Sequence, residues 1–289
     1  MEKKGKLYYI INIITLTVSI LLLLIYVSNN INLINITISE LIIYLIFFIG
    51  LNIVKYVRQY IIFLEEKISL KRYTKLYIKT TLVNIILPFK LGELFKMYCF
   101  GKKIGNYKKG IIGTLLDRFV DTVVLVLFLV PIELELGMLS TITILLITFV
   151  VIMIIFIIAV PNTYKYLNKF LIVNKPSKLS LHILKGLEQI NELYQYGLQL
   201  FKGRVYLLAI MSIISWYIDF YLIKIISIFK ANMFDLSVFI EYLTSAIYQP
   251  NNIVLMHYYI IAAIAFTGIN LAIYGVDYVK KLGGAKWKI

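Results

Sequence analysis

Charged side chains recur inside the long apolar stretches of this 289-residue sequence. The segment LPFKLGELFKMY, residues 87–98, holds Glu93 and Lys96 three positions apart, and DRFVD, residues 117–121, opens another apolar stretch. A charge surrounded by lipid is costly, so each of these residues is a functional candidate. Arginine binds phosphate through paired hydrogen bonds, which makes Arg118 a candidate ligand for an anion. Glu93 could instead bind a cation or a proton.

The spacing of these charges predicts which of them meet. Asp117 and Asp121 are four residues apart and lie on one helix face, while Arg118 precedes Asp121 by three and can reach it. Two interpretations remain open for each close pair, an ion pair that only orients helices or a substrate site. For Asp121 the structural role is favoured. Lys55 and Arg58 lie late in an apolar stretch, where long side chains snorkel to the membrane surface, and Arg58 is also a candidate for headgroup binding.

Residue counts disfavour several other chemistries. The chain has one cysteine, Cys99, and two histidines, His182 and His257, so it can form no internal disulfide and a metal centre is not expected. No G-x-x-x-x-G-K-S/T motif occurs, which argues against direct use of ATP. We therefore expect no catalytic residues, no metal, no cofactor and no enzymatic activity.

The elements that position these charges are membrane spans. The chain is 61% hydrophobic and 16% charged, and several apolar runs reach the roughly 20 residues that cross a bilayer. Its 30 Lys and Arg exceed its 15 Asp and Glu, and in a membrane protein this excess marks cytoplasmic loops rather than a nucleic-acid site. The predicted spans are about 7–27, 41–64, 111–130, 141–160, 205–228 and 253–277. The distribution of Lys and Arg places both termini in the cytoplasm of a cell-membrane protein.

Two shorter segments are expected to enter the membrane and turn back. Pro88 disfavours helix at Leu87 and Gly92 permits a close backbone approach, so the chain should break there, between cytoplasmic lysines. A second break is expected at Pro250. The predicted fold is all-α, a polytopic transmembrane bundle of six full spans with two re-entrant hairpins, or eight spans if both hairpins cross fully.

The sequence predicts one integral membrane domain over residues 1–289. Its first half covers 7–130, its second half covers 205–289, and a cytoplasmic loop at 161–204 separates them. That loop contains LSLHILKGLEQINELYQYGLQLF, whose Leu and Ile spacing predicts an amphipathic helix on the membrane surface. One proline break in each half is typical of transporters built from repeats.

The sequence resembles a known family between about residues 41 and 130. The order is N-x-x-L-P-x-x-x-G-E, a basic residue three positions later, G-K-K-I-G, and then D-R-F-V-D at the start of an apolar helix. This order resembles the flippase-like integral membrane family, which includes the transmembrane half of bacterial lysylphosphatidylglycerol synthases. The matching residues are Asn84, Pro88, Gly92, Glu93, Lys96, Gly105, Asp117, Arg118 and Asp121. Lys96 and Asp117 replace the arginine and glutamate common in the family, and of its later Pro-Gly-Gly pattern only Pro250 matches.

The resemblance implies movement of an anionic or aminoacylated phospholipid, or of a polyprenyl-linked lipid, between leaflets. Headgroup contacts are expected from Glu93, Lys96, Arg118, Asp117 and Arg58, and the partners are membrane lipids. One alternative is a membrane-embedded transferase acting on a lipid carrier, with Glu93 or Asp117 as acid or base. Another is an accessory protein that joins a partner in envelope assembly and moves nothing itself.

Overall fold

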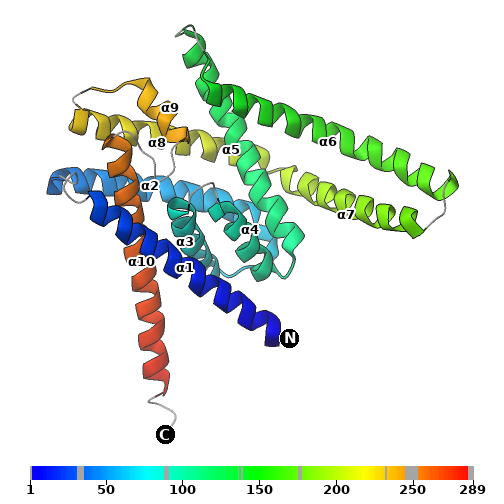
Figure 1. Ribbon diagram of the computed structural model, residues 1–289, viewed down its shortest axis with the longest axis horizontal. Coiled ribbons are helices and arrows are strands. Elements are labelled where there is room, and N and C mark those ends of the chain that lie inside the picture. The colour runs from blue at the N-terminus through cyan, green and yellow to red at the C-terminus, as the bar shows by residue number, and fades with distance from the viewer. Residues whose placement is uncertain are drawn as a thin grey trace. The chain divides into compact units, whose positions relative to one another are not determined.

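Helices are the regular secondary structure of the described residues in a computed structural model (Figure 1). The structure describes residues 2–30, 36–87, 91–135, 137, 139–174, 178–231, 233–244 and 253–285. The elements are α1 (Glu2–Asn30), α2 (Ile38–Ile62), the 3-10 helix η2 (Leu64–Glu66), α3 (Leu70–Ile86), α4 (Leu91–Ile104), α5 (Tyr107–Glu135), α6 (Thr141–Asn174), α7 (Lys178–Phe201), α8 (Val205–Ala231), α9 (Leu236–Thr244) and α10 (Ile253–Ala285). The predicted all-α class is confirmed.

Four helical segments of the described residues are long and apolar enough to cross a membrane. They are Ile38–Ile62, Thr141–Val173, Val205–Ala231 and Ile253–Leu271. The spans predicted near 7–27 and 111–130 also lie within helices, α1 and α5. Helix formation follows from the apolar runs, because a backbone in lipid must satisfy its hydrogen bonds within the segment.

Two helices extend beyond the spans predicted for them. The span expected to stop near residue 130 continues as α5 through Pro131 to Glu135, and the one expected to stop near 160 continues as α6 through Pro161 to Asn174. The first part of the predicted 161–204 loop is therefore helix. Proline is tolerated inside apolar spanning helices because neighbouring groups satisfy the freed carbonyl.

Glu133, near the C-terminal end of α5, is a buried cap for the start of α6. Its carboxylate accepts hydrogen bonds from the Ser140 amide at 2.8 Å, the Ser140 hydroxyl at 2.8 Å and the Thr143 hydroxyl at 2.9 Å. These donors stand at the start of α6, where backbone amides lack helical partners. Glu133 therefore fixes the α5–α6 turn.

The chain divides into two compact units. Unit 1 comprises Met1–Tyr56, Ile68–Phe100 and Tyr217–Ile289, and unit 2 comprises Val57–Lys67 and Gly101–Trp216. The units alternate along the chain, so α2, α4 and α8 each contribute residues to both.

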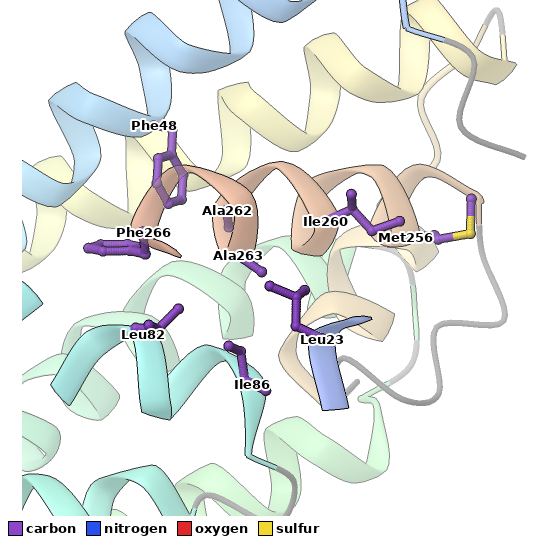
Figure 2. Packing of buried hydrophobic residues seen from close by; sticks show 9 residues of the cluster. All are labelled: Leu23, Phe48, Leu82, Ile86, Met256, Ile260, Ala262, Ala263 and Phe266. Atoms are coloured by element: carbon purple, nitrogen blue, oxygen red, sulfur yellow. The ribbon is translucent and has the colours of Figure 1, made fainter. Parts of the chain in front are cut away.

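The core of unit 1 forms where α10 packs on α1, α2 and α3. Figure 2 shows Leu23 of α1 and Leu82 and Ile86 of α3 facing the buried side of α10. On α2, the ring of Phe48 meets Phe266 of α10 edge to face, with centroids 5.4 Å apart. Close packing of this kind lets unit 1 hold buried polar groups at fixed positions.

The predicted break after α3 is confirmed. Leu87 is extended, with φ −75° and ψ 131°, as expected of a residue before proline, while Pro88 itself lies outside the described residues. α4 then returns beside α3. A Cβ on Gly92 would lie 2.2 Å from the Cα of Asn84, so only glycine allows the two helices this approach. The predicted second break at Pro250 lies outside the described residues.

In unit 2, α7 lies beside α6 and also contacts α5 (Figure 1). The predicted amphipathic helix is confirmed as α7. Polar contacts hold the part of α7 near its C-terminal end. Glu66 of η2 accepts hydrogen bonds from Lys109 at 2.7 Å and from the Tyr196 hydroxyl at 3.0 Å. Burial, together with Glu66, raises the pKa of Tyr196, so this hydroxyl stays protonated and donates.

Candidate functional site

Arg58 is the centre of a buried polar network in unit 2. Its Nε donates to Asp117 Oδ1 at 2.8 Å, and its Nη1 donates to the Ser212 hydroxyl at 2.7 Å and to Asp121 Oδ1. Ser212 in turn donates to Asp121 Oδ1 at 2.6 Å. The side chains of Arg58, Asp117 and Asp121 are 5%, 3% and 7% exposed. We call these residues, with Arg118, the Arg58 centre.

Helix geometry explains how the Arg58 centre forms. Asp117 and Asp121 are four residues apart on α5, so both carboxylates face α2 as the spacing predicted. Ser212 comes from α8, and the indole of Trp216, one turn later, donates to the carbonyl of Asp121 at 3.2 Å. Three helices are thereby joined through one guanidinium.

The snorkelling interpretation is wrong for Arg58. Its guanidinium does not extend to a surface, since the residue is only 4% exposed and both aspartates hold it. Snorkelling requires the charged end to reach water. A guanidinium between two carboxylates avoids that need, because the opposite charges compensate for its desolvation.

Arg118 occupies a different position in the same centre. Its side chain is 40% exposed, and its Nη1 lies 3.9 Å from Asp121 Oδ2, the oxygen that Arg58 does not use. The predicted contact between Arg118 and Asp121 is thus confirmed as a long ion pair. The four charges of the centre, Arg58 and Arg118 against Asp117 and Asp121, cancel. Arg118 is the charged side chain of the centre that is partly exposed, although its Nε is buried.

Glu93 and Lys96, the other predicted ligands, belong to unit 1. Both lie on α4 and are 8% exposed. Glu93 stands in the first turn of α4, where the helix dipole favours a negative charge. Gly105 of the motif follows the last residue of α4 and has φ +82°, a conformation that glycine adopts without strain.

Unit 1 has a polar centre that the charge pattern only partly indicates. Asp219, in the middle of α8 and 0% exposed, accepts a hydrogen bond from Lys55 at 2.7 Å through Oδ2. Its Oδ1 accepts from the hydroxyls of Tyr258 at 3.0 Å and Tyr242 at 3.3 Å, which lie 3.1 Å from each other. We call these four residues the Asp219 centre. It joins α2, α8, α9 and α10.

The charge pattern indicated the charged residues of the Arg58 centre and Lys55 of the Asp219 centre, but it missed the uncharged members of both. Ser212, Tyr242 and Tyr258 give no signal, because serine and tyrosine are common in apolar helices and at membrane surfaces. The sequence also does not show which lysine forms the ion pair with Asp219. Lys224 lies near it in sequence, whereas Lys55, 164 residues away, makes the ion pair.

Comparison with known families is decisive for the class of this protein. Residues 10–248 match the family described as the lysylphosphatidylglycerol synthase TM region. The chain belongs to this family. Comparisons with curated proteins and with solved structures give no match.

Membership of the lysylphosphatidylglycerol synthase TM region family confirms the resemblance read from the Asn84–Asp121 motif. The matched residues include the whole Arg58 centre, and they end before α10 begins at Ile253. Together with the apolar helices, the match establishes a multi-pass membrane protein whose function is related to membrane lipids.

Proposed function

We propose that this protein is a lipid flippase that binds an anionic phospholipid headgroup and moves it between the leaflets of the cell membrane. Aminoacylated phospholipids and polyprenyl-linked lipids share the phosphate that this proposal requires. The chain acts as a carrier and not as an enzyme, with membrane lipids as its partners. In this proposal the chain crosses the membrane six times and enters it twice more as re-entrant hairpins, with both termini in the cytoplasm.

The observation that carries the proposal is that the two arginines of the Arg58 centre interact with different oxygens of Asp121. Asp121 accepts hydrogen bonds from Arg58 and Ser212 at Oδ1, while Arg118 Nη1 lies 3.9 Å from Oδ2. A phosphate can therefore draw Arg118 away from Oδ2 without unpairing Arg58. The centre then binds an anion while its buried charges remain compensated.

The depth of Arg118 supports a role in crossing the membrane. It stands seven residues after residue 111, where the predicted span begins, which corresponds to roughly 10 Å along the helix axis. The hydrocarbon layer is about 30 Å thick, so in this proposal the backbone at Arg118 stands about one third of the way across it. A positive charge at such a depth lowers the cost of bringing a phosphate there.

Arg58 takes a different role from the one expected of it. Asp117 and Asp121 already occupy its guanidinium, and its side chain is 5% exposed. We assign Arg58 and Asp117 as positioning residues that hold α2 against α5. Arg118 is the residue that contacts the headgroup.

Native mass spectrometry of the detergent-solubilised protein tests the proposal. Bound phosphatidylglycerol would be counted on wild type, Arg118→Gln, Arg118→Lys and Arg72→Gln, the last removing an exposed arginine of α3. A charge-assisted hydrogen bond contributes about 1.5–3 kcal/mol, so Arg118→Gln should weaken binding at least about tenfold. Arg118→Lys should restore part of it, and Arg72→Gln should change nothing. Equal binding by all four proteins would reject Arg118 as the headgroup contact.

A further inference from the structure

Three buried side chains of unit 1 that carry no carboxylate have polar atoms that find no hydrogen-bond partner within the described part of the chain. They are the hydroxyl of Tyr44 on α2, the hydroxyl of Ser227 on α8 and Nε2 of His257 on α10. Each residue is 1% exposed. A buried polar group left unsatisfied is destabilising, so such atoms in a native fold indicate a missing partner. We call these three residues the Tyr44 cluster.

Two ion pairs place Tyr44 and Ser227 at the same depth. Glu40 of α2 binds Lys230 of α8 at 2.7 Å, and fifteen residues further along α2 Lys55 binds Asp219, which lies eleven residues before Lys230. The two helices are therefore antiparallel. Tyr44 follows Glu40 by one turn and Ser227 precedes Lys230 by about one turn, so both stand just inside the Glu40–Lys230 pair. The ring of Tyr44 also meets that of Phe229, with centroids 6.2 Å apart.

His257 belongs to the same region. It stands one turn into α10, and its imidazole lies within the electrostatic reach of both Glu40 and Lys230. Tyr44 likewise lies within the electrostatic reach of Glu40. The ion pair thus joins α2 to α8 at the end of unit 1 where α2 and α10 begin and α8 ends, and His257 of α10 lies near it.

The hydrogen-bonding capacity of the Tyr44 cluster defines the ligand it can take. Nδ1 of His257 lies 2.7 Å from the carbonyl oxygen of Ile253, which can only accept, so Nδ1 carries the proton. In the neutral ring Nε2 is then an acceptor, while the two hydroxyls can each donate and accept. A phosphate oxygen cannot donate to Nε2, and an ammonium cannot accept from the hydroxyls. An alcohol does both, and the adjacent charges of Glu40 and Lys230 cancel.

We propose that the Tyr44 cluster binds the hydroxyl groups of a lipid headgroup, such as glycerol or a sugar. This inference rests on the proposed function and deepens it, because it requires a headgroup that carries free hydroxyls as well as the phosphate. The basic residues of the loops assign this end of unit 1 to the outer side of the membrane, so the cluster receives the headgroup where it leaves the protein.

Nitrogen-15 NMR of the two imidazoles tests the Tyr44 cluster without requiring transport. The chain has two histidines, and His182→Gln assigns the remaining signals to His257. The probes are phosphatidylglycerol, phosphatidylpropanol, which has the same charge but no headgroup hydroxyl, and glucosyl diacylglycerol, which has sugar hydroxyls but no phosphate. Phosphatidylglycerol or the glycolipid should shift the Nε2 resonance at a concentration about tenfold below any effect of phosphatidylpropanol. Whichever of the two acts identifies the source of the hydroxyls.

Substitutions decide whether the response comes from this cluster. Tyr44→Phe and Ser227→Ala should each raise the lipid concentration needed for half of the shift by about fivefold. Tyr217→Phe removes an exposed hydroxyl of α8 and should leave the lipid concentration at half of the shift unchanged. An equal response to all three lipids, or an Nε2 signal that no hydroxyl-bearing lipid moves because buried water already occupies it, would overturn the inference. Because binding is measured at equilibrium, failure of transport alone would count only against the proposed function.

Discussion

Arg58 Nε on α2 and Asp117 Oδ1 on α5 lie 2.8 Å apart, although 59 residues separate them in the chain. Both side chains are almost fully buried, at 5% and 3% exposure. The pair therefore joins two helices through charges that neither helix could keep in an apolar interior alone. The neighbouring Arg118 lies on the same turn of α5, with its Nη1 3.9 Å from Asp121 Oδ2.

Substitution of Arg58 should destabilise the protein much more than substitution of Arg118. Arg58→Met leaves Asp117 and Asp121 buried without their partner, so the free energy of unfolding should fall by about 3–5 kcal/mol. Arg118→Met removes a long, partly exposed ion pair and should cost at most about 1 kcal/mol. Reversible unfolding in mixed micelles measures both values. A larger loss for Arg118→Met than for Arg58→Met would contradict these roles.

Gly92→Ala should separate α3 from α4. The added Cβ would lie 2.2 Å from the Asn84 Cα, which is backbone and cannot move alone, so we expect a loss of at least about 1–3 kcal/mol. Gly50→Ala is the matched control, because nothing lies within 4 Å of its Cβ position on α2. There alanine should be neutral or stabilising by up to about 1 kcal/mol. Thermal unfolding of both variants distinguishes close packing from a general effect of replacing glycine.

The Asp219 centre should show strong coupling between its two charges. Asp219→Asn removes the carboxylate that pairs with Lys55, and Lys55→Met removes the cation beside the buried Asp219, which keeps its contacts with the hydroxyls of Tyr242 and Tyr258. The double variant should lose less stability than the sum of the losses in the two single variants. A double-mutant cycle on unfolding free energy should give a coupling of about 1–3 kcal/mol. Additive effects would mean that the ion pair does not stabilise unit 1.

Much of this arrangement is contained in the local sequence. Pro88 and Gly92 predict the break and the close return of α4, and the spacing of Asp117 and Asp121 predicts their shared face. Their partner could not be predicted, because Arg58 and Lys55 look alike in sequence as long side chains near the end of an apolar run. Only packing decides that Arg58 meets α5 while Lys55 meets Asp219. The Tyr44 cluster gave no sequence signal, since its members are uncharged and lie on three helices.

Asp235, which precedes α9, should make that helix sensitive to acid. Hydrogen bonds from the hydroxyl and then the amide of Ser237 lower the pKa of Asp235 below its ordinary value of 3.8. Its contribution is therefore complete above the ordinary pKa and is lost as the pH falls through the lower pKa of the folded state. Hydrogen exchange of α9 should accelerate at acid pH in wild type. Asp235→Asn should weaken this pH dependence, and an unchanged dependence would exclude Asp235 as its source.

The most direct test of lipid translocation uses liposomes that contain the purified protein and a fluorescent anionic phospholipid in both leaflets. An impermeant quencher added outside reports how much labelled lipid becomes accessible. The account predicts protein-dependent loss of the protected fraction in wild type and in Arg72→Gln, and a rate reduced at least about tenfold in Arg118→Gln, whose fold should be intact. Glu93→Gln should also slow the exchange if its charge is required. Well-folded wild type that exposes no more lipid than empty liposomes would contradict the account.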